Sequence, residues 1–224
     1  MPRERYQDAL ETLRGDVLEM GEQVDAQLET ALESLATGSE ASARAVIEGD
    51  AGINERYLAL ETDCVDLFAL QQPVAGDLRF VTASFKIITD LERIGDLAVN
   101  LARYARAADR TLDPDVALDA IGEAARSLLD RSLEAYAAED AAACRRIAAD
   151  DDDVDALCQR ASETVTRELI ERRVDEDPWT VERLLDDVSR VLLTIRDLER
   201  VADHAVNVAA RTLYMVDGDP ELIY

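Results

Sequence analysis

The sequence is poor in the residues that build sheets and tight turns. Aromatic residues make up 4% of the chain, and its 224 residues include only 9 glycines and 5 prolines. What remains is dominated by Ala, Leu, Val, Arg, Asp and Glu. Because aromatic residues favour strands, whereas Ala, Leu, Arg and Glu favour helices, this composition predicts an all-α fold.

Cysteine is also scarce, and Cys64, Cys144 and Cys158 form neither a CxxC pair nor an even set. They give no indication of a zinc ribbon or a disulfide framework, and we expect them to be buried or half-buried in a reducing cytoplasm. No apolar run approaches the roughly 18 residues of a membrane span, and the N-terminus has no apolar export segment. We expect a soluble, cytoplasmic protein without direct membrane insertion.

Basic residues are few: 24 Lys and Arg stand against 49 Asp and Glu, which gives a net charge of −25. This charge repels phosphate backbones and anionic lipids, which argues against nucleic acid or a membrane surface as a partner. Lys86 is the only lysine, and the acids are spread along the whole chain. Such a surface is typical of proteins from high salt, where screening weakens self-repulsion, so we predict a halophilic origin.

Apolar residues recur every three or four positions in three long segments, which predicts amphipathic helices. Two segments run from Leu13 to Leu35 and from Ile87 to Leu101. The clearest stripe consists of Leu184, Val188, Val191, Ile195, Leu198, Ala202, Ala205 and Ala209. The chain is interrupted at Gly38-Ser39, Gln72-Pro73, Asp113-Pro114, Glu139-Asp140, Asp177-Pro178 and Asp217-Gly218-Asp219-Pro220. These breaks predict six helices of roughly 30 residues, three before Pro114 and three after it.

One phrase occurs twice in the chain. Asp90 to Asn100 reads DLERIGDLAVN, and 107 positions later Asp197 to Asn207 reads DLERVADHAVN. When both are extended by two residues, 9 of 13 positions are identical. Unrelated stretches of this length share about one residue, so the phrase indicates an internal duplication.

Earlier parts of the chain also match, at an offset of 101. Met20-Gly21-Glu22 precedes Ile121-Gly122-Glu123 by this distance, and Ala31-Leu32 precedes Ser132-Leu133. A period near 100 residues is too long for a solenoid unit and suits a duplicated helical bundle. We therefore predict two tandem, pseudo-symmetric three-helix bundles, at residues 1–113 and 114–224.

The repeated phrase carries a column of oxygen-bearing side chains. Residues at i, i+4 and i+8 advance by only about 40° per step around a helix, so they lie one above another. The two columns are Glu92, Asp96 and Asn100, and Glu199, Asp203 and Asn207. Counted around the helix, each column borders the apolar stripe without being part of it. We expect these side chains at the edge of the core.

Two carboxylates one turn apart repel each other, and a cation between them reverses that effect. Carboxylate and amide oxygens suit Mg²⁺, Ca²⁺ or Mn²⁺, and carboxylate-rich sites also hold iron. One column provides too few ligands, so a second helix must contribute. The candidates are Asp50 and Asn54 in the first half and Asp151 and Asp155 in the second.

A purely structural interpretation stays open beside the metal one. With 49 acids in 224 residues, about ten i, i+4 acidic pairs arise by chance, so the spacing alone has little weight. Arg93 and Arg200 are placed to pair with the neighbouring acids, and the asparagines are able to bond locally. The only histidine, His204, is matched by Leu97 in the first copy. A phosphorelay, a di-iron centre with two Glu-x-x-His pairs, or another enzyme active site is therefore not expected.

The segment from Gln71 to Ala102, QQPVAGDLRFVTASFKIITDLERIGDLAVNLA, resembles the most characteristic region of the PhoU family of phosphate-signalling regulators. The second phrase DLERVADHAVN, the early MGEQVDAQLETAL and the final DGDPELIY extend the resemblance over nearly the full chain. The later copy has DPWTVERLL where the first has the lead-in PVAGDLR. The resemblance thus covers both halves but not identically.

The resemblance implies two three-helix bundles in a protein that is usually dimeric. It also implies divalent or multinuclear metal ions, such as Mg, Mn, Fe or Zn, on the helix faces at Glu92 with Asp96 and at Glu199 with Asp203. The function implied is restraint of a high-affinity ABC phosphate transporter when phosphate is plentiful, together with a sensor kinase. We expect contact with a cytoplasmic transporter component rather than catalysis. The alternatives are a metal-free structural adaptor, an accessory protein of a different phosphate transporter, and a metallo-hydrolase.

Overall fold

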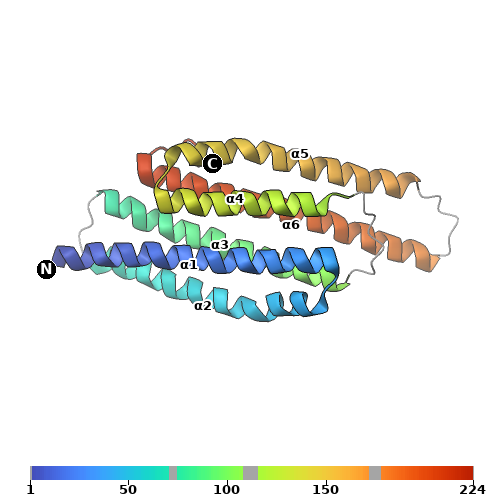
Figure 1. Ribbon diagram of the computed structural model, residues 1–224, viewed down its shortest axis with the longest axis horizontal. Helices are drawn as coiled ribbons and strands as arrows, with labels where there is room; N and C mark the ends of the chain where they lie inside the picture. Colours follow the sequence, from blue (N-terminus) through green and yellow to red (C-terminus); the bar gives the residue numbers. More distant parts are fainter. Residues whose placement is uncertain (1, 71–74, 108–115, 172–177, 224) are drawn as a thin grey trace.

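A computed structural model describes residues 2–70, 75–107, 116–171 and 178–223 (Figure 1). Within these ranges the chain forms six helices and no strand, which confirms the all-α prediction. The helices are α1 (Pro2–Thr37), α2 (Glu40–Leu70), α3 (Ala75–Ala107), α4 (Leu118–Ala138), α5 (Ala141–Glu171) and α6 (Pro178–Asp217). The predicted boundary between residues 113 and 114 lies outside the described residues.

The two short helix connections that are described use the same construction. Gly38 and Glu139 follow α1 and α4 and both have left-handed backbones, with φ of 66° and 53°. The next residues, Ser39 and Asp140, cap the following helix, because each side chain accepts a hydrogen bond from the amide three positions on, at 3.1 and 2.9 Å. These pairs are 101 positions apart, so the duplication extends to the turns.

Helix lengths follow the duplication with one exception. The bounds of α5, at 141 and 171, lie 101 positions after those of α2, at 40 and 70. Helix α4 has only 21 residues against 36 in α1, so the expectation of roughly 30 residues per helix is wrong there. At an offset of 101, residues 2–16 of α1 correspond to residues 103–117, which include the end of α3. Residues 103–107 of that stretch belong to α3, and residues 108–115 lie outside the described part of the chain.

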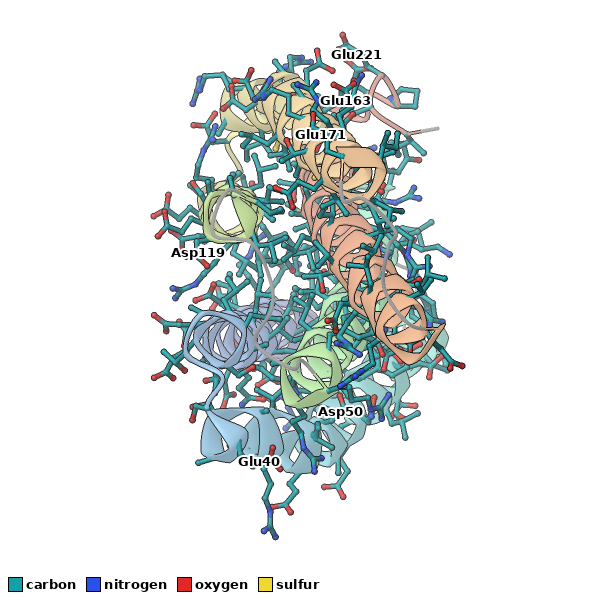
Figure 2. All side chains as sticks on the ribbon, turned by 90° about the vertical axis from the view of Figure 1, so that its right-hand side faces the viewer. Glu40, Asp50, Asp119, Glu163, Glu171 and Glu221 are labelled. Atoms are coloured by element: carbon teal, nitrogen blue, oxygen red, sulfur yellow. The ribbon has the colours of Figure 1, made fainter. Side chains whose placement is uncertain are left out.

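The two halves form three-helix bundles that lie side by side along their length (Figure 1). Helix α1 packs against α4, and α3 packs against α6. Each of these pairs runs antiparallel, and the end-on view of Figure 2 places α2 and α5 at opposite ends of the cross-section. The labelled acids Glu40, Asp119 and Glu221 lie on different sides of the molecule in the end-on view (Figure 2). A halophilic origin stays a prediction.

Each half contributes the same contact to the α1–α4 interface. A Cβ atom built on Gly21 would lie 2.5 Å from Cδ2 of Leu133, and one built on Gly122 would lie 2.6 Å from Cδ2 of Leu32. Because Gly122 and Leu133 stand 101 positions after Gly21 and Leu32, the two contacts are reciprocal. Reciprocal contacts are what a twofold relationship between two equivalent units produces. The pseudo-symmetry predicted from the sequence therefore has a direct structural counterpart.

One continuous apolar core joins all six helices. The stripe predicted in α6 is buried from Val191 to Ala209, while Leu184 and Val188 are half-buried nearer its start. Cys64, Cys144 and Cys158 are buried and free, as expected. None of the helices in the described ranges combines the length and apolar character that crossing a bilayer requires.

Candidate metal site in each half

The first candidate site lies between α2 and α3. Asp50 and Asn54 come from α2, whereas Glu92 and Asp96 come from α3 (Figure 2 labels Asp50). Burial raises the pKa of Glu92, and the negative charges of Asp96 and Asp50 raise it further. Asp50 therefore lies near enough to the α3 column to influence Glu92, and the role of these residues as metal ligands stays a prediction. Asn100, the third member of the column, is half-buried one turn further along α3.

The acids of the first site already have partners in the protein. The amide of Asn54 donates a hydrogen bond to Oδ2 of Asp50 at 2.9 Å. The guanidinium of Arg93 lies 3.5 Å from Oε2 of Glu92 and 3.4 Å from Oδ2 of Asp96. The ion pairing that the sequence allowed for Arg93 is thus present, and it partly neutralises this column.

The second candidate site lies between α5 and α6 and consists of four carboxylates. Asp151 and Asp155 come from α5, and Glu199 and Asp203 come from α6. Burial and the charge of Asp155 raise the pKa of both Glu199 and Asp203. As a whole residue Asp203 remains exposed, yet partial burial of its carboxylate is the largest cause of its raised pKa. These acids therefore lie near enough to influence one another's pKa values across the α5–α6 contact, and their role as metal ligands stays a prediction.

Asp151 has the most perturbed carboxylate of this cluster. Its Oδ1 atom is buried and has no hydrogen-bond partner among the described residues. Burial, together with the charges of four acids including Asp155, Asp203 and Glu199, raises its pKa to about 6. A buried acceptor without a donor is unfavourable, so it is a candidate for binding a ligand that supplies positive charge.

Asn207, the last member of the second column, turns toward the other half of the molecule. Its amide donates a hydrogen bond to Oδ1 of Asp90 on α3 at 3.3 Å. Nδ1 of His204 lies 2.9 Å from the same oxygen. The only histidine of the chain thus joins α6 to α3, directly after Asp203 in the sequence.

Two aspartates with this joining role escaped the sequence analysis. Asp90 and Asp197 are the first residues of the two repeated phrases, and each contacts the other half. Asp197 is fully buried, where it accepts a hydrogen bond from the hydroxyl of Tyr104 at 3.0 Å and pairs with Arg196 at 2.7 Å. The repetition could have identified them, because both copies of the eleven-residue phrase begin with an aspartate.

The donor atoms of both sites are chemically suited to a cation. They are carboxylate and amide oxygens, which hard divalent ions prefer. Within the part of the chain that the structure describes, no group of three or more His, Cys, Asp or Glu side chains is arranged so that it could hold a metal ion. Cys158 lies beside the second cluster, but burial and the nearby acids raise the pKa of its thiol to about 12. The second cluster therefore presents oxygen rather than sulfur.

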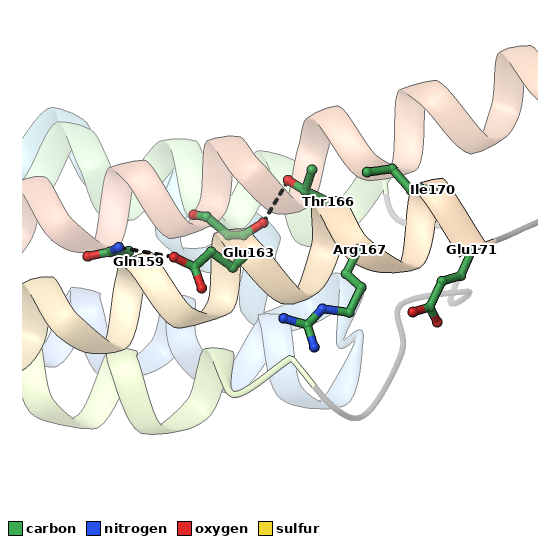
Figure 3. A pocket seen from close by; sticks show the side chains of 7 residues that line it. Gln159, Glu163, Thr166, Arg167, Ile170 and Glu171 are labelled. Atoms are coloured by element: carbon green, nitrogen blue, oxygen red, sulfur yellow. Dashed lines mark hydrogen bonds between the residues drawn. The ribbon is translucent and has the colours of Figure 1, made fainter.

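Two hollows on the described part of the surface do not involve these residues. The hollow shown in Figure 3 is formed by α5 alone and is lined by Gln159, Ser162, Glu163, Thr166, Arg167, Ile170 and Glu171. Its hydrogen bonds, from Gln159 to Glu163 and from Thr166 to the backbone of Ser162, connect neighbouring turns of that helix (Figure 3). A second cavity, near Arg14 and Phe80, lies where α1, α3, α4 and α6 meet. Neither hollow is lined by a candidate metal-binding residue.

Comparison with known proteins decides the family. The family model of the PhoU domain matches the chain twice, at residues 17–105 and 118–212. The chain belongs to the PhoU family. Each match covers three helices, α1 to α3 and α4 to α6, so the PhoU domain repeats as the two bundles do. The resemblance drawn from the repeated phrases is confirmed.

The relatives of this PhoU family member are similar over almost its whole length. A phosphate-specific transport system accessory protein PhoU homolog from Pseudomonas putida is 33% identical over 218 residues, covering 96% of this chain and 82% of that protein. Homolog 1 from Methanothermobacter thermautotrophicus is 31% identical and covers 96% and 95%.

Solved PhoU structures have the same fold. The crystal structure of PhoU from Pseudomonas aeruginosa superimposes with a TM-score of 0.87 at 30% identity. The match covers 96% of this chain and 100% of that chain. The phosphate transport system regulatory protein PhoU from Streptococcus pneumoniae superimposes with a TM-score of 0.84 at 27% identity, with 96% and 98% covered. Two three-helix bundles are therefore the architecture of this chain.

Proposed function

We propose that this PhoU family member regulates phosphate uptake as an accessory protein of a phosphate transport system. The observation that carries this proposal is the double PhoU domain match, joined to relatives that match 96% of this chain and are named as phosphate-specific transport system accessory proteins. The described residues show helical surfaces and carboxylate clusters rather than a nucleophile paired with a base. Regulation by contact fits these features better than catalysis does.

Cations bound at the two sites would organise the regulatory surface. Asp50, Glu92 and Asp96 would hold an ion between α2 and α3, and Asp151, Asp155, Glu199 and Asp203 would hold one between α5 and α6. The bound ion supplies positive charge that neutralises the mutually repelling carboxylates. The buried, unpaired Oδ1 of Asp151 supports this role. Mg, Mn, Fe or Zn, singly or as clusters, are the candidate ions.

The partner in this proposal is the cytoplasmic component of an ABC phosphate transporter, and a sensor kinase is the second partner. The stiff helical body, acting as a homodimer, would dock on the transporter and favour its inactive state when phosphate is plentiful. An accessory protein shifts such an equilibrium only by the difference between its affinities for the two states. Cation binding changes the charge of the accessory protein, and this changes the difference between its affinities for the two states of the transporter.

The test replaces Glu92, Asp96, Glu199 and Asp203 with Ala. This variant is expected to lose bound metal and to relieve the restraint on phosphate uptake in cells. A matched control replaces the exposed acids Glu123, Asp130, Glu134 and Glu182, which changes the net charge equally and leaves both sites intact. Unchanged metal content in the first variant would remove the cation from the mechanism, and unchanged uptake would remove the regulatory role.

A metal-free structural adaptor is the second candidate, and the ion pairs of Arg93 favour it in the first half. Such a protein would restrain the transporter through its helical surface alone. Elemental analysis of protein purified without added ions separates the two candidates, because only the metal-binding regulator retains metal that the four substitutions remove.

A further inference from the structure

Exposed apolar side chains gather on one face of α2. Of the six large apolar side chains that are exposed in the described residues, four belong to α2 or to the first turn of α3. Leu58, Val65 and Phe68 of α2 are 58%, 52% and 37% exposed, and Leu78 of α3 is 43% exposed. Positions 58, 65 and 68 fall within about 80° around a helix, so these three residues form one stripe, the α2 stripe. Single apolar residues are ordinary on a surface, whereas a stripe of them indicates a contact.

The α2 stripe faces away from the rest of the molecule. Among the described helices, α2 packs against α1 and α3 only, and it lies at one end of the cross-section (Figure 2). The buried residues in the same part of α2 are Leu60, Cys64 and Leu67. The centre of the stripe lies about 120° around the helix from the centre of these residues. The stripe is therefore on the outer side of the first bundle.

Acidic side chains accompany the α2 stripe. Glu61 falls within the arc of the stripe, and Glu55 and Asp66 lie within about 80° of Leu58 around the helix. Residues 55–70 include a single base, Arg56, and its guanidinium pairs with two acids of α1. The apolar stripe therefore lies in a negatively charged surface.

The second half has a different surface at the equivalent place. At the offset of 101, Leu58 and Val65 correspond to Gln159 and Thr166 of α5, and the third position of the stripe has Leu169, which is half-buried. The equivalents of the three acids are Ala156, Ser162 and Arg167. Figure 3 shows Gln159, Thr166 and Arg167 along this part of α5. The combination of an apolar stripe with acids therefore belongs to the first half.

Charge decides which partner fits the α2 stripe. A second copy of the chain would place the same acids against one another, and the net charge of −25 repels an anionic membrane. A helix with apolar residues on one face and Lys or Arg beside them matches both the stripe and its acids. The stripe is about 15 Å long at 1.5 Å per residue, so about three turns of such a helix cover it.

We propose that the α2 stripe, together with Glu55, Glu61 and Asp66, binds a basic amphipathic helix of the transport-system component that this protein regulates. This inference rests on the proposed function, because it names the surface through which the protein contacts its partner. The apolar residues supply most of the affinity, and the acids select and orient the partner. None of the candidate metal ligands belongs to this surface, so it can be altered without changing them.

The first experiment measures binding of a fluorescein-labelled model peptide by fluorescence anisotropy. The peptide has about 20 residues, with leucines every three or four positions and lysines and alanines elsewhere. Leu58→Gln with Val65→Thr introduces the second half's own side chains at exposed positions and should weaken binding at least about tenfold. Ile170→Thr with Leu185→Gln removes two exposed apolar side chains of the second half and should leave the affinity unchanged. A peptide of the same composition in scrambled order reports binding by charge alone.

The acids are tested in the same assay. Glu61→Gln with Asp66→Asn should weaken peptide binding by about threefold and reduce its dependence on salt. Glu123→Gln with Asp130→Asn removes the same charge from exposed positions of α4 and should change neither. Circular dichroism of each variant confirms that it is folded.

The second experiment measures phosphate uptake in cells. Leu58→Gln with Val65→Thr should relieve the restraint on uptake and leave the metal content unchanged. Peptide binding that survives these two substitutions overturns the inference, and so does uptake that stays restrained in this variant. Both outcomes leave the proposed function standing.

Two further outcomes also decide the matter. Analytical ultracentrifugation that shows self-association of the chain, abolished by Leu58→Gln with Val65→Thr, while the peptide does not bind, would assign the α2 stripe to a second copy instead. An original protein that does not restrain uptake at all would overturn the proposed function itself, and with it the transport-system partner named here.

Discussion

Asp25 and Arg126 stand at equivalent positions of the two halves and form a bidentate ion pair across the α1–α4 contact, with both N to O distances at 2.8 Å. A twofold arrangement brings equivalent residues face to face, so an unchanged duplicate would place two like charges here. The two copies instead carry opposite charges, and Glu29 adds a second acid 2.9 Å from Arg126. This pair therefore favours association of the first half with the second.

Reversing one charge of this pair should weaken the contact between the halves. Asp25→Arg places two guanidinium groups together and should lower the free energy of unfolding by about 1–2 kcal/mol, a range that allows for partial solvent screening. The double variant Asp25→Arg with Arg126→Asp should recover most of that loss. Urea denaturation of the original protein, of both single variants and of the double variant measures these differences. A double variant as unstable as the sum of its single changes would show that the pair does not interact.

The close approach of α1 and α4 depends on two glycines. Gly21→Ala inserts a methyl group 2.5 Å from Leu133, which must shift within the core. Overpacking of this kind lowers the free energy of unfolding by about 1–3 kcal/mol, which exceeds the roughly 1 kcal/mol that Ala gains over Gly in a helix. We therefore expect Gly21→Ala to be destabilising in thermal unfolding experiments.

A control for that change exists in the same helix. Gly15 is exposed, and a Cβ atom there would meet nothing within 4 Å. Gly15→Ala should therefore stabilise the protein by about 0.5–1 kcal/mol. Adding Leu133→Ala to Gly21→Ala should remove the clash, so the two substitutions should be strongly non-additive. Additive effects would mean that Leu133 is not what limits the space at Gly21.

The metal-free protein should lose stability as the pH rises through the acidic range. Folding raises the pKa of Asp151 from an ordinary 3.8 to about 6, so between these values the folded state binds more protons than the unfolded state. Stability falls with pH wherever the folded state binds the extra proton. Asp151→Asn removes this dependence. Its stability relative to the original protein should increase from pH 3.8 to about 6 and then level off.

This pH dependence is measured by urea denaturation at a series of pH values in the presence of a chelator. The expected gain for Asp151→Asn above pH 6 is about 1–2 kcal/mol, after discounting for solvent screening of a half-buried group. Asp153→Asn removes the same charge two positions away, on the exposed side of α5, and should show no such trend. A gain that is constant with pH would contradict the assignment to Asp151.

Cations should stabilise the folded protein through the same acids. An ion that binds only the folded state adds about 2.7 kcal/mol to the free energy of unfolding for each site at a concentration of 100 times its Kd. Adding Mn²⁺ should therefore raise the Tm of the original protein but not that of the variant with Ala at Glu92, Asp96, Glu199 and Asp203. An equal rise in both proteins would indicate a general salt effect.

Much of the fold follows from local features of the sequence. The stripe of α6 is buried from Val191 onward, and the left-handed residues Gly38 and Glu139 lie at two of the predicted breaks. Helical periodicity and caps depend on residues within one or two turns of each other, so they can be recognised without knowing the fold. The sequence did not predict that α4 is short. Its first residue, Leu118, is preceded by Ala117, which makes no side-chain cap, so no local residue marks where the helix begins.

The candidate site was predictable only in part. The spacing of Glu92 with Asp96 and of Glu199 with Asp203 placed each pair on one helix face, and equivalence between the copies brought in Asp50 and Asp151. The partners of the amides were not predictable. Asn54 bonds within its own helix, whereas Asn207 reaches Asp90 in the other half. The direction of a flexible polar side chain depends on what a neighbouring helix presents to it.

By itself, the sequence determined that this chain is a duplicated set of amphipathic helices with acids at matching places, because periodicity and repetition are properties of the order of residues. Only the tertiary structure decided how the copies meet. Gly21 lies beneath Leu133, Asp25 pairs with Arg126, and Asp151 is left with an unpaired buried oxygen. These relationships join residues about 50 or more positions apart, and they arise from close packing between helices, which no local pattern encodes.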